Sequence, residues 1–312
     1  FLAGGGGPRV IATPGHFAYV KIAEGCANRC SFCLIPSLRG PAKSRPVEAI
    51  VREAESLASS GARELIVIAQ DTTAYGRDLY GRPSLARLLR ELAGVEGIDW
   101  IRVMYTYPSL IDDELIEVFA GEDRIVKYLD IPMQHGSDNV LRMMNRRSSR
   151  EQMIGVCRRL RERVPGLVIR TSLIAGFPGE TDDDFEELLS FIDIVRPERA
   201  GVFEFSAEEG TRAYDMPGQV PREVATDRRG VAMEALARIS RQFGQSRIGS
   251  VVRVLVDGPS DESDLVVEAR SYAEAPEVDG KIYIGDACLT PGEMVDVVIT
   301  DAGQYDLAAE RA

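Results

Sequence analysis

The sequence is poor in side chains that bind metal ions, with two histidines and five cysteines among 312 residues. The histidines, His16 and His135, do not form a ligand pair. A structural zinc site normally closes its tetrahedron with four protein ligands, and no second cluster follows the three cysteines within residues 26–33. Three cysteines so close together cannot all pair as disulfides. These shortages disfavour both a zinc finger and a disulfide scaffold.

Long apolar runs and positive charge are also scarce. No apolar run approaches the length that spans a bilayer, so we expect no membrane partner. The net charge is -12 and the pI is near 4.9, so direct nucleic-acid binding is not expected. Hydrophobic residues make up 45% of the chain, which is ample for a large core and two domains.

The first residues form a distinct segment. The chain begins at Phe1 and continues with the glycine-rich stretch LAGGGGPRV. Such a composition is typical of a flexible linker. We interpret residues 1–15 as a linker and the remnant of a preceding domain.

Apolar strands alternate with amphipathic helices between residues 16 and 248. Continuous apolar runs predict six strands, and helical spacing with Pro, Thr and Gly boundaries predicts the helices between and after them. The expected strands are 17–23, 64–70, 100–105, 127–133, 167–180 and 200–206. The expected helices are 46–61, 84–94, 112–121, 149–166, 181–197 and 222–245, with Thr181 as an N-cap. Six units of this kind predict a parallel sheet that forms a partial (β/α)6 barrel.

The pattern changes at the C-terminal end. Residues 249–312 contain short strands separated by Gly, Pro and Asp. This spacing predicts a second domain, a small OB-like antiparallel β-barrel.

The polar and glycine-rich segments of the first domain all follow strands. In a parallel sheet these loops meet at the carboxyl edge, where the site of such folds lies. The segments are 26–33, 69–72, 107–109, 132–137, 176–180 and 206–211. The first of them holds Cys26, Cys30 and Cys33 in the spacing CxxxCxxC. Three thiolates would fill three corners of a 4Fe-4S cluster and leave one iron open for chemistry.

These features resemble the radical S-adenosylmethionine (SAM) enzymes and, more narrowly, the methylthiotransferases of the RimO type. The resemblance rests on EGCANRCSFCLIPSLRG, AQDTTAYG, YLDIPMQHGS, RTSLIAGFPGET, EEGTRAYDMP and YDLAAE, which occur in this order. It implies a radical SAM barrel followed by a TRAM domain. It also implies methylthiolation at the β-carbon of an aspartate in small-subunit ribosomal protein twelve. The alternatives are a tRNA adenosine methylthiotransferase and a non-enzymatic zinc-binding module.

The resemblance also implies the cofactors and the electron source. Cys26, Cys30 and Cys33 would bind the 4Fe-4S cluster, and the open iron would bind the amine and carboxylate of SAM. A flavodoxin or ferredoxin would reduce the cluster. The family carries a second, auxiliary 4Fe-4S cluster in an N-terminal domain that we expect to be missing from this chain.

Five further residues are candidates for SAM contacts. Phe32 lies between two ligands, where the family usually has an apolar residue, and its alternative is a core phenylalanine. Gln70 ends a strand and could instead cap a turn, and Gln134 ends a strand where it could line the SAM or the substrate pocket. Arg170 could pair with the SAM carboxylate or form an internal ion pair. Gly176 could admit the SAM adenine or ribose, or it could form a plain strand–helix turn. No catalytic residue is assigned, and we expect Cys157 and Cys288 to be packing residues.

Acidic residues dominate the small domain. Residues 249–312 contain fourteen carboxylates and four basic side chains, a net charge of −10. Such a domain would repel phosphate and suit a basic protein surface. We therefore expect Asp257, Asp261 and Asp264 to attract a basic ribosomal protein, in the cytoplasm.

Overall fold

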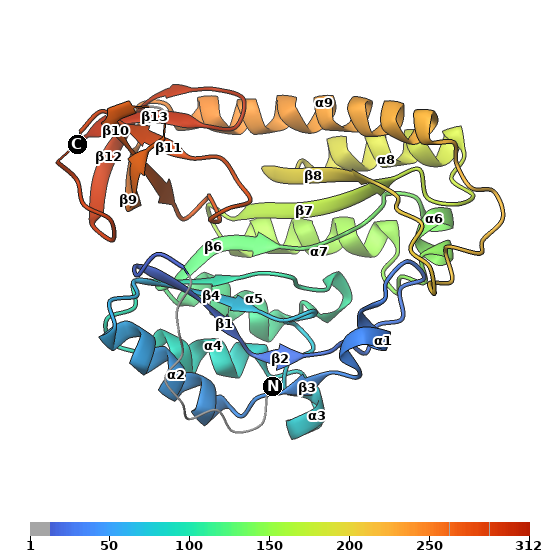
Figure 1. Cartoon of the computed structure of the whole chain (residues 1–312), viewed down its shortest axis with the longest axis horizontal. Coiled ribbons are helices and arrows are strands. Elements are labelled where there is room, and N and C mark those ends of the chain that lie inside the picture. Colours follow the sequence, from blue (N-terminus) through green and yellow to red (C-terminus); the bar gives the residue numbers. More distant parts are fainter. Residues whose placement is uncertain (1–12, 262, 287) are drawn as a thin grey trace.

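The computed structural model describes residues 13–261, 263–286 and 288–312. Its central element is a parallel sheet in which every strand pairs with the next one along the chain. The strands in spatial order are β1 (Phe17–Lys21), β4 (Glu64–Ile68), β5 (Trp100–Val103), β6 (Ile125–Asp130), β7 (Val168–Ala175) and β8 (Arg199–Glu204). This is the predicted partial barrel, open between β1 and β8 (Figure 1).

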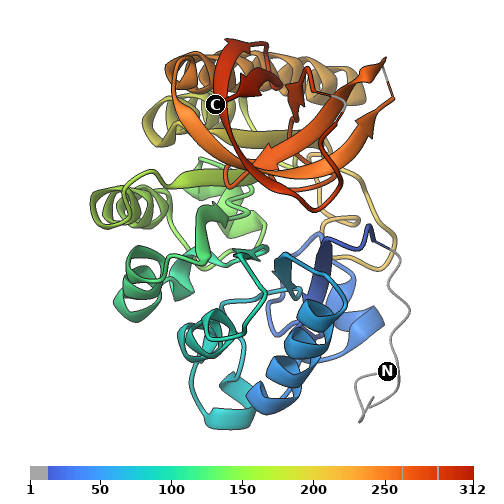
Figure 2. The same ribbon diagram turned by 90° about the vertical axis from the view of Figure 1, so that its left-hand side faces the viewer.

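Helices follow the strands and cover the outer side of the sheet as an arc (Figure 2). They are α2 (Val47–Ser59), α4 (Leu85–Ala93), α5 (Asp113–Gly121), α7 (Arg150–Arg163), α8 (Asp182–Val195) and α9 (Arg222–Arg247). Side chains on one face of each strand, such as Val20, Leu65 and Ile101, are completely buried against them. Thr181 caps α8 as predicted, because its hydroxyl accepts a hydrogen bond from the amide of Asp184. None of the helices in the described residues is long and apolar enough to cross a membrane.

The loops contain short elements that the sequence did not predict. They are β2 (Ala23–Glu24), α1 (Ile35–Arg39), β3 (Lys43–Ser44), α3 (Arg77–Tyr80), η1 (Pro108–Leu110) and α6 (Asp138–Met143). Segments of this length show no clear apolar periodicity, so pattern analysis does not detect them.

The C-terminal strands close into a five-stranded barrel. They are β9 (Val251–Ser260), β10 (Ser263–Ser271), β11 (Ile282–Ile284), β12 (Met294–Ala302) and β13 (Leu307–Arg311), in the spatial order β10-β11-β13-β12-β9. The barrel is not wholly antiparallel as predicted, because β11 and β13 run parallel. An odd number of strands cannot alternate in direction around a closed ring, so at least one pair must be parallel.

The small barrel packs against the inner face of the sheet, opposite to α1 and α6 (Figure 1). Apolar contacts join Phe17, Trp100 and Val168, at the amino ends of their strands, to Leu255 and Ala273 of the barrel. The barrel therefore covers one end of the sheet and leaves the carboxyl edge to the loops.

Buried ion pairs reinforce this interface. The carboxylate of Glu64 is inaccessible to solvent and accepts hydrogen bonds of 2.7 Å from Arg102 of the sheet and from Arg270 of the barrel. Glu274 of the barrel pairs with Arg199 and Arg247 from the first domain, each at 2.7 Å. Burial alone would raise the pKa of Glu274, but the two guanidinium groups outweigh it and hold that pKa at about 2.

We expect Glu64→Gln to lower the free energy of unfolding by about 3 kcal/mol, because the substitution leaves two buried guanidinium groups without a charge that they share. Glu114→Gln is the matched control, since Glu114 pairs with Arg90 at the same 2.7 Å but both side chains are 44% exposed. That change should cost at most about 1 kcal/mol. Urea unfolding followed by circular dichroism measures both, and equal losses would contradict this account of the interface.

Candidate active site

The cysteine loop connects β2 with α1 at the carboxyl edge of the sheet, and β3 follows α1 and pairs with β2. The base of the loop is closed by the amide of Cys26, which donates to the carbonyl of Gly40 at 3.2 Å. Gly25 adopts a φ of 78°, and a Cβ there would lie 2.3 Å from the Pro41 carbonyl oxygen. Only glycine fits this approach without displacing the backbone. Gly25 thus allows the close backbone contact that positions Cys26 at the start of the loop.

All three cysteines of the motif line one cavity of about 180 Å³. They are half-buried free thiols. The other lining residues come from the loops after the strands: Asn28, Phe32, Ile35, Gln70, Asp71, Tyr105, Thr106, Tyr107, Pro132, Gln134 and Arg146. Loops from distant parts of the sequence therefore meet at these sulfur atoms, as expected for the edge of a parallel sheet.

The donor set suits a multi-iron cluster better than a single ion. A mononuclear zinc site needs all of its donors about 2.3 Å from one point. Within the described parts of the chain, no three His, Cys, Asp or Glu side chains are grouped to hold one metal ion. In a 4Fe-4S cluster each thiolate binds a different iron, so the sulfur atoms can lie further apart.

Burial affects the chemistry of these thiols. It raises the pKa of Cys26 and of Cys33 above the usual value, and the carboxylate of Asp71 adds to the effect at Cys26. Metal binding requires the thiolate, so binding at this loop releases protons and depends on pH. The raised pKa values of Cys26 and Cys33 thus favour the protonated thiols until a positive centre compensates the thiolate charge.

Three of the predicted SAM contacts line the cavity. Phe32 lies edge-on to Phe177, with ring centroids 6.3 Å apart. Gln70 donates to Glu24 at 3.3 Å, while its side-chain oxygen is buried without a hydrogen-bond partner among the described residues. Gln134 takes a left-handed backbone, with φ of 73°. The structure brings these residues together with the cysteines, and their contact with SAM stays a prediction.

The other two predicted contacts do not line this cavity. Arg170 is the third residue of β7 and pairs with Asp130 at 2.8 Å and with Asp279 of the small barrel at 3.6 Å. Of the two predictions for Arg170, the structure therefore shows the internal ion pair. Gly176 forms a turn with φ of 77°, where a Cβ would lie 2.3 Å from the Cβ of Ala225 in α9. Close packing of that helix requires the glycine.

Backbone strain marks Gln134, a predicted SAM contact, together with two residues that the sequence did not single out, Tyr105 and Asn145. Among the described residues, five non-glycine residues have positive φ, and three of them surround the cysteines: Tyr105, Gln134 and Asn145. Such conformations cost free energy and cluster at functional sites. Tyr105 lines the cavity, and its amide donates to the buried carboxylate of Asp130 at 2.9 Å. The one feature of the sequence that could have indicated Tyr105 as a site residue is its position just after β5.

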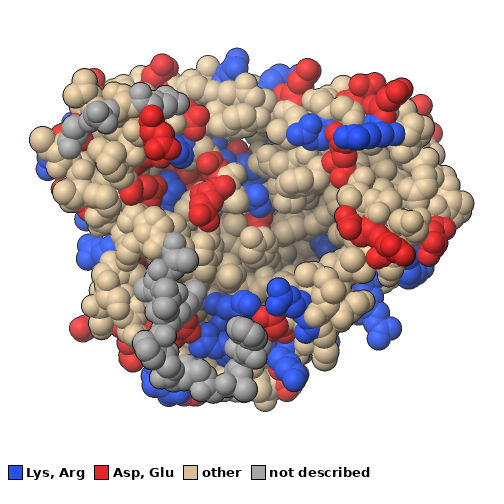
Figure 3. All heavy atoms as spheres, viewed as in Figure 1, with Lys and Arg blue, Asp and Glu red and all other residues tan. Residues whose placement is uncertain are grey.

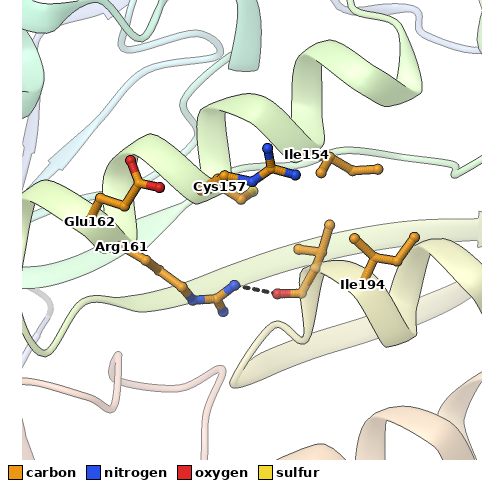
Figure 4. A pocket seen from close by; sticks show the side chains of 7 residues that line it. Ile154, Cys157, Arg161, Glu162 and Ile194 are labelled. Carbon is orange, nitrogen blue, oxygen red and sulfur yellow. Dashed lines mark hydrogen bonds between the residues drawn. The ribbon is translucent and has the colours of Figure 1, made fainter.

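A larger groove of about 370 Å³ lies between α7 and α8, away from the cysteine loop (Figure 4). Cys157 faces it but is only 3% exposed, and burial raises the pKa of its thiol to about 12. Arg161 donates to the carbonyl of Val195 across the groove. Cys157 is thus a packing residue as predicted. Cys288 is exposed, so the same prediction is wrong for it, because it lies in a turn after β11 rather than in a strand.

Comparison with known proteins agrees with this geometry. The profile of the radical SAM superfamily matches residues 20–192, and that of the TRAM domain matches residues 248–311. A Pelotomaculum thermopropionicum protein named ribosomal protein uS12 methylthiotransferase RimO is 51% identical over 97% of this chain and 68% of that protein. This chain belongs to the RimO family of radical SAM methylthiotransferases. It is therefore a transferase of that enzyme family.

Other matches support the family and the fold. The RimO protein of Anaeromyxobacter sp. (strain K) is 52% identical over 96% of this chain and 64% of that protein. The chain thus spans about two thirds of these relatives. The structure of coproporphyrinogen III oxidase (HemN) from Escherichia coli, a radical SAM enzyme, aligns with a TM-score of 0.55 at 19% identity, covering 75% of this chain and 55% of that one. At this identity the likeness shows the radical SAM fold.

Replacing Cys26, Cys30 and Cys33 together with Ala should abolish iron binding after anaerobic reconstitution, because the loop supplies all the thiolates of one cluster. The unchanged chain should bind about four irons. Cys288→Ala is the matched control: it removes an exposed thiol and should keep all the iron. Iron and sulfide analysis gives the answer, and iron retained by the triple variant would contradict the site.

Proposed function

We propose that this chain carries out the radical SAM chemistry by which a methylthio group is placed on the β-carbon of an aspartate in ribosomal protein uS12. The observation that carries the proposal is the single cavity at the carboxyl edge that all three motif cysteines line. Membership in the RimO family and the names of the relatives supply the reaction and the substrate.

The proposed roles follow from the contacts of the residues. Cys26, Cys30 and Cys33 hold a 4Fe-4S cluster, which when bound supplies the electron that splits SAM into methionine and a 5′-deoxyadenosyl radical. Gln70 orients the SAM amine, because its buried side-chain oxygen has no donor among the described residues and an ammonium group provides one. Phe32 covers the adenine side of the cavity with an apolar surface.

The chain's own residues also place an apolar surface beside the cavity. Phe32, Phe177 and Phe205 form a chain of edge-on aromatic contacts behind the cavity, with centroid distances of 6.3 and 5.1 Å. No histidine is among the described residues that line the cavity, and His135 is fully buried facing Glu180 at 3.6 Å. The aromatic rings thus make one side of the cavity apolar, which limits the access of water to reacting atoms on that side.

The source of sulfur lies outside the residues of this cavity. After the motif cysteines the sequence contains Cys157 and Cys288 alone, one buried in a helix and one exposed in a turn. These two cysteines are too few, and too different in their surroundings, to bind a second cluster. We propose that the auxiliary 4Fe-4S cluster of the family, which handles sulfide, is supplied by a domain beyond these residues. A flavodoxin or ferredoxin in the cytoplasm is the proposed electron donor.

The small barrel recruits the substrate in this proposal, but not through all three aspartates that its sequence suggested. Asp261 is exposed, the side chain of Asp264 lies outside the described residues, and Asp257 is paired within the protein. Asp257 binds Arg270 at 2.7 Å and His16 at 2.9 Å, so it belongs to the interface between the domains. Figure 3 shows acidic and basic side chains close together where the barrel meets the sheet. The exposed carboxylates of the barrel remain available to a basic protein: Asp261, Asp296, Asp301, Asp306 and Glu310.

The first test is the reaction itself. The reconstituted chain, supplied with SAM, dithionite and sulfide, should form 5′-deoxyadenosine and, with the auxiliary domain restored, add the mass of one methylthio group to uS12. Mass spectrometry of uS12 peptides locates the group. Modification of a tRNA anticodon stem-loop in place of uS12 would move the assignment to the tRNA-modifying relatives.

The second test concerns recruitment. Reversing Asp261, Asp296 and Glu310 to Lys should weaken uS12 binding about tenfold at low salt, and the difference should shrink as salt shortens the Debye length below about 10 Å. SAM cleavage should not change.

The control for this test is a chain with the same change in net charge elsewhere. Glu91 and Glu151 are exposed on α4 and α7, and Glu96 is exposed in the turn after α4; reversing all three to Lys should leave uS12 binding nearly unchanged. Titration calorimetry at several salt concentrations measures both variants. Equal weakening by the two sets would show that overall charge, rather than the barrel surface, attracts the substrate.

A further inference from the structure

A guanidinium group lies beside the cysteine motif although its residue is far away in sequence. Arg146 follows α6, and its Nη1 lies 3.7 Å from the Sγ of Cys30. Its Nη2 donates a 2.6 Å hydrogen bond to the carbonyl of Pro132, which follows β6. Among the described residues that line the cavity, Arg146 carries the one positive charge.

The position of this cation is fixed by its surroundings. The guanidinium lies over the ring of Tyr107, 4.1 Å from the centroid, in a cation–π contact. The amide of Arg146 donates to the carbonyl of Leu141 at 2.8 Å. The preceding residue, Asn145, has the left-handed φ of 56° that turns the chain at the end of α6. An asparagine tolerates this conformation better than most residues.

The guanidinium is not neutralised by the contacts that hold it. Its partners are a thiol, a carbonyl and an aromatic ring, and its Nε is buried without a hydrogen-bond partner among the described residues. Arg146 does not form an ion pair within the described part of the chain. The positive charge of Arg146 is therefore uncompensated and lies beside the sulfur atom of Cys30.

The one carboxylate that lines the same cavity is in a different state. Asp71 accepts hydrogen bonds from the side chains of Asn28 at 2.7 Å and Thr73 at 2.6 Å, and from the amide of Ala74 at 3.1 Å. Three donors thus spread its negative charge and hold it in place. Among the described residues, the site thus combines a hydrogen-bonded anion with a cation that lacks a counter-charge.

We propose that Arg146 sets the reduction potential of the iron–sulfur cluster by compensating the charge that the cluster gains on reduction. The inference rests on the proposed function, since it takes Cys30 as a cluster ligand. Reduction adds one negative charge, and a fixed cation a few ångströms from a ligand sulfur stabilises that state in a partly buried site. Net charge and hydrogen bonds to the sulfurs are the quantities that tune such potentials.

Arg146→Met should lower the midpoint potential of the cluster. At a fixed potential the ratio of reduced to oxidised cluster should fall about tenfold, which corresponds to about 59 mV for one electron. Redox titration of the anaerobically reconstituted chain with dithionite, followed by electron paramagnetic resonance without SAM, measures the shift. Arg146→Lys keeps the charge and should recover most of it.

The control is Arg142→Met, which removes the same charge from an exposed side chain of α6 and should leave the potential unchanged. Tyr107→Leu removes the ring under the guanidinium and should shift the potential in the same direction as Arg146→Met, by less. If Arg146→Met does not assemble a cluster, the midpoint potential of Tyr107→Leu tests the role of Arg146 instead.

The outcomes separate this inference from the function on which it rests. If the unchanged chain binds no iron–sulfur cluster, the proposed function fails. If it binds one but Arg146→Met and Tyr107→Leu leave the midpoint unchanged in the absence of SAM, the cluster site stands and the role of Arg146 is overturned. A shift that appears only with SAM would also overturn it, because Arg146 would then act on the carboxylate of SAM.

Discussion

The parallel direction of the six sheet strands is the constraint on which the site depends. Every loop that follows a strand reaches the same edge, so residues from 26 to 146 can line one cavity. Cys30 and Arg146, for example, are 116 residues apart and lie in contact there. Short elements that the loops form, such as α1 and α6, then direct individual side chains toward the sulfur atoms. The chemistry is thus assembled by topology rather than by a single segment.

The opposite end of the sheet binds the small barrel. There the small barrel docks through a core of aromatic and apolar side chains and through the buried carboxylates of Glu64 and Glu274. A buried charge is costly unless it is paired, so each carboxylate favours the docking geometry that completes its pair of guanidinium groups. The small barrel and the cysteine cavity therefore lie at opposite ends of the sheet. Under the proposed function, a substrate recruited by the barrel has to extend from one end of the sheet to the other.

How far the sequence predicted this structure depends on the range of the interactions. The buried strands and the amphipathic helices follow from local pattern, and the cysteine motif follows from spacing. Asp257, in contrast, reads as a surface charge in the sequence and turns out to bind Arg270 and His16. Arg170 likewise reads as a cofactor contact but pairs with Asp279, more than a hundred residues away.

Such long-range pairs leave no local signal, because the partner is chosen by the fold. Arg146 was missed for the same reason: it follows a short helix that shows no periodicity, and its cavity neighbours come from other loops. The parallel pairing of β11 and β13 is set by ring closure rather than by the residues of either strand. Pattern thus predicts elements and motifs, while charge pairing across the fold needs the structure.

The central claim is that the cysteine loop leaves one iron open to SAM at the carboxyl edge of the sheet. The most direct measurement is the electron paramagnetic resonance spectrum of the reduced, reconstituted chain before and after saturating SAM. If SAM binds the open iron, the spectrum changes, because a new ligand alters the electronic environment of the cluster. An unchanged spectrum at saturating SAM would show that a fourth ligand closes the cluster, and it would contradict the account.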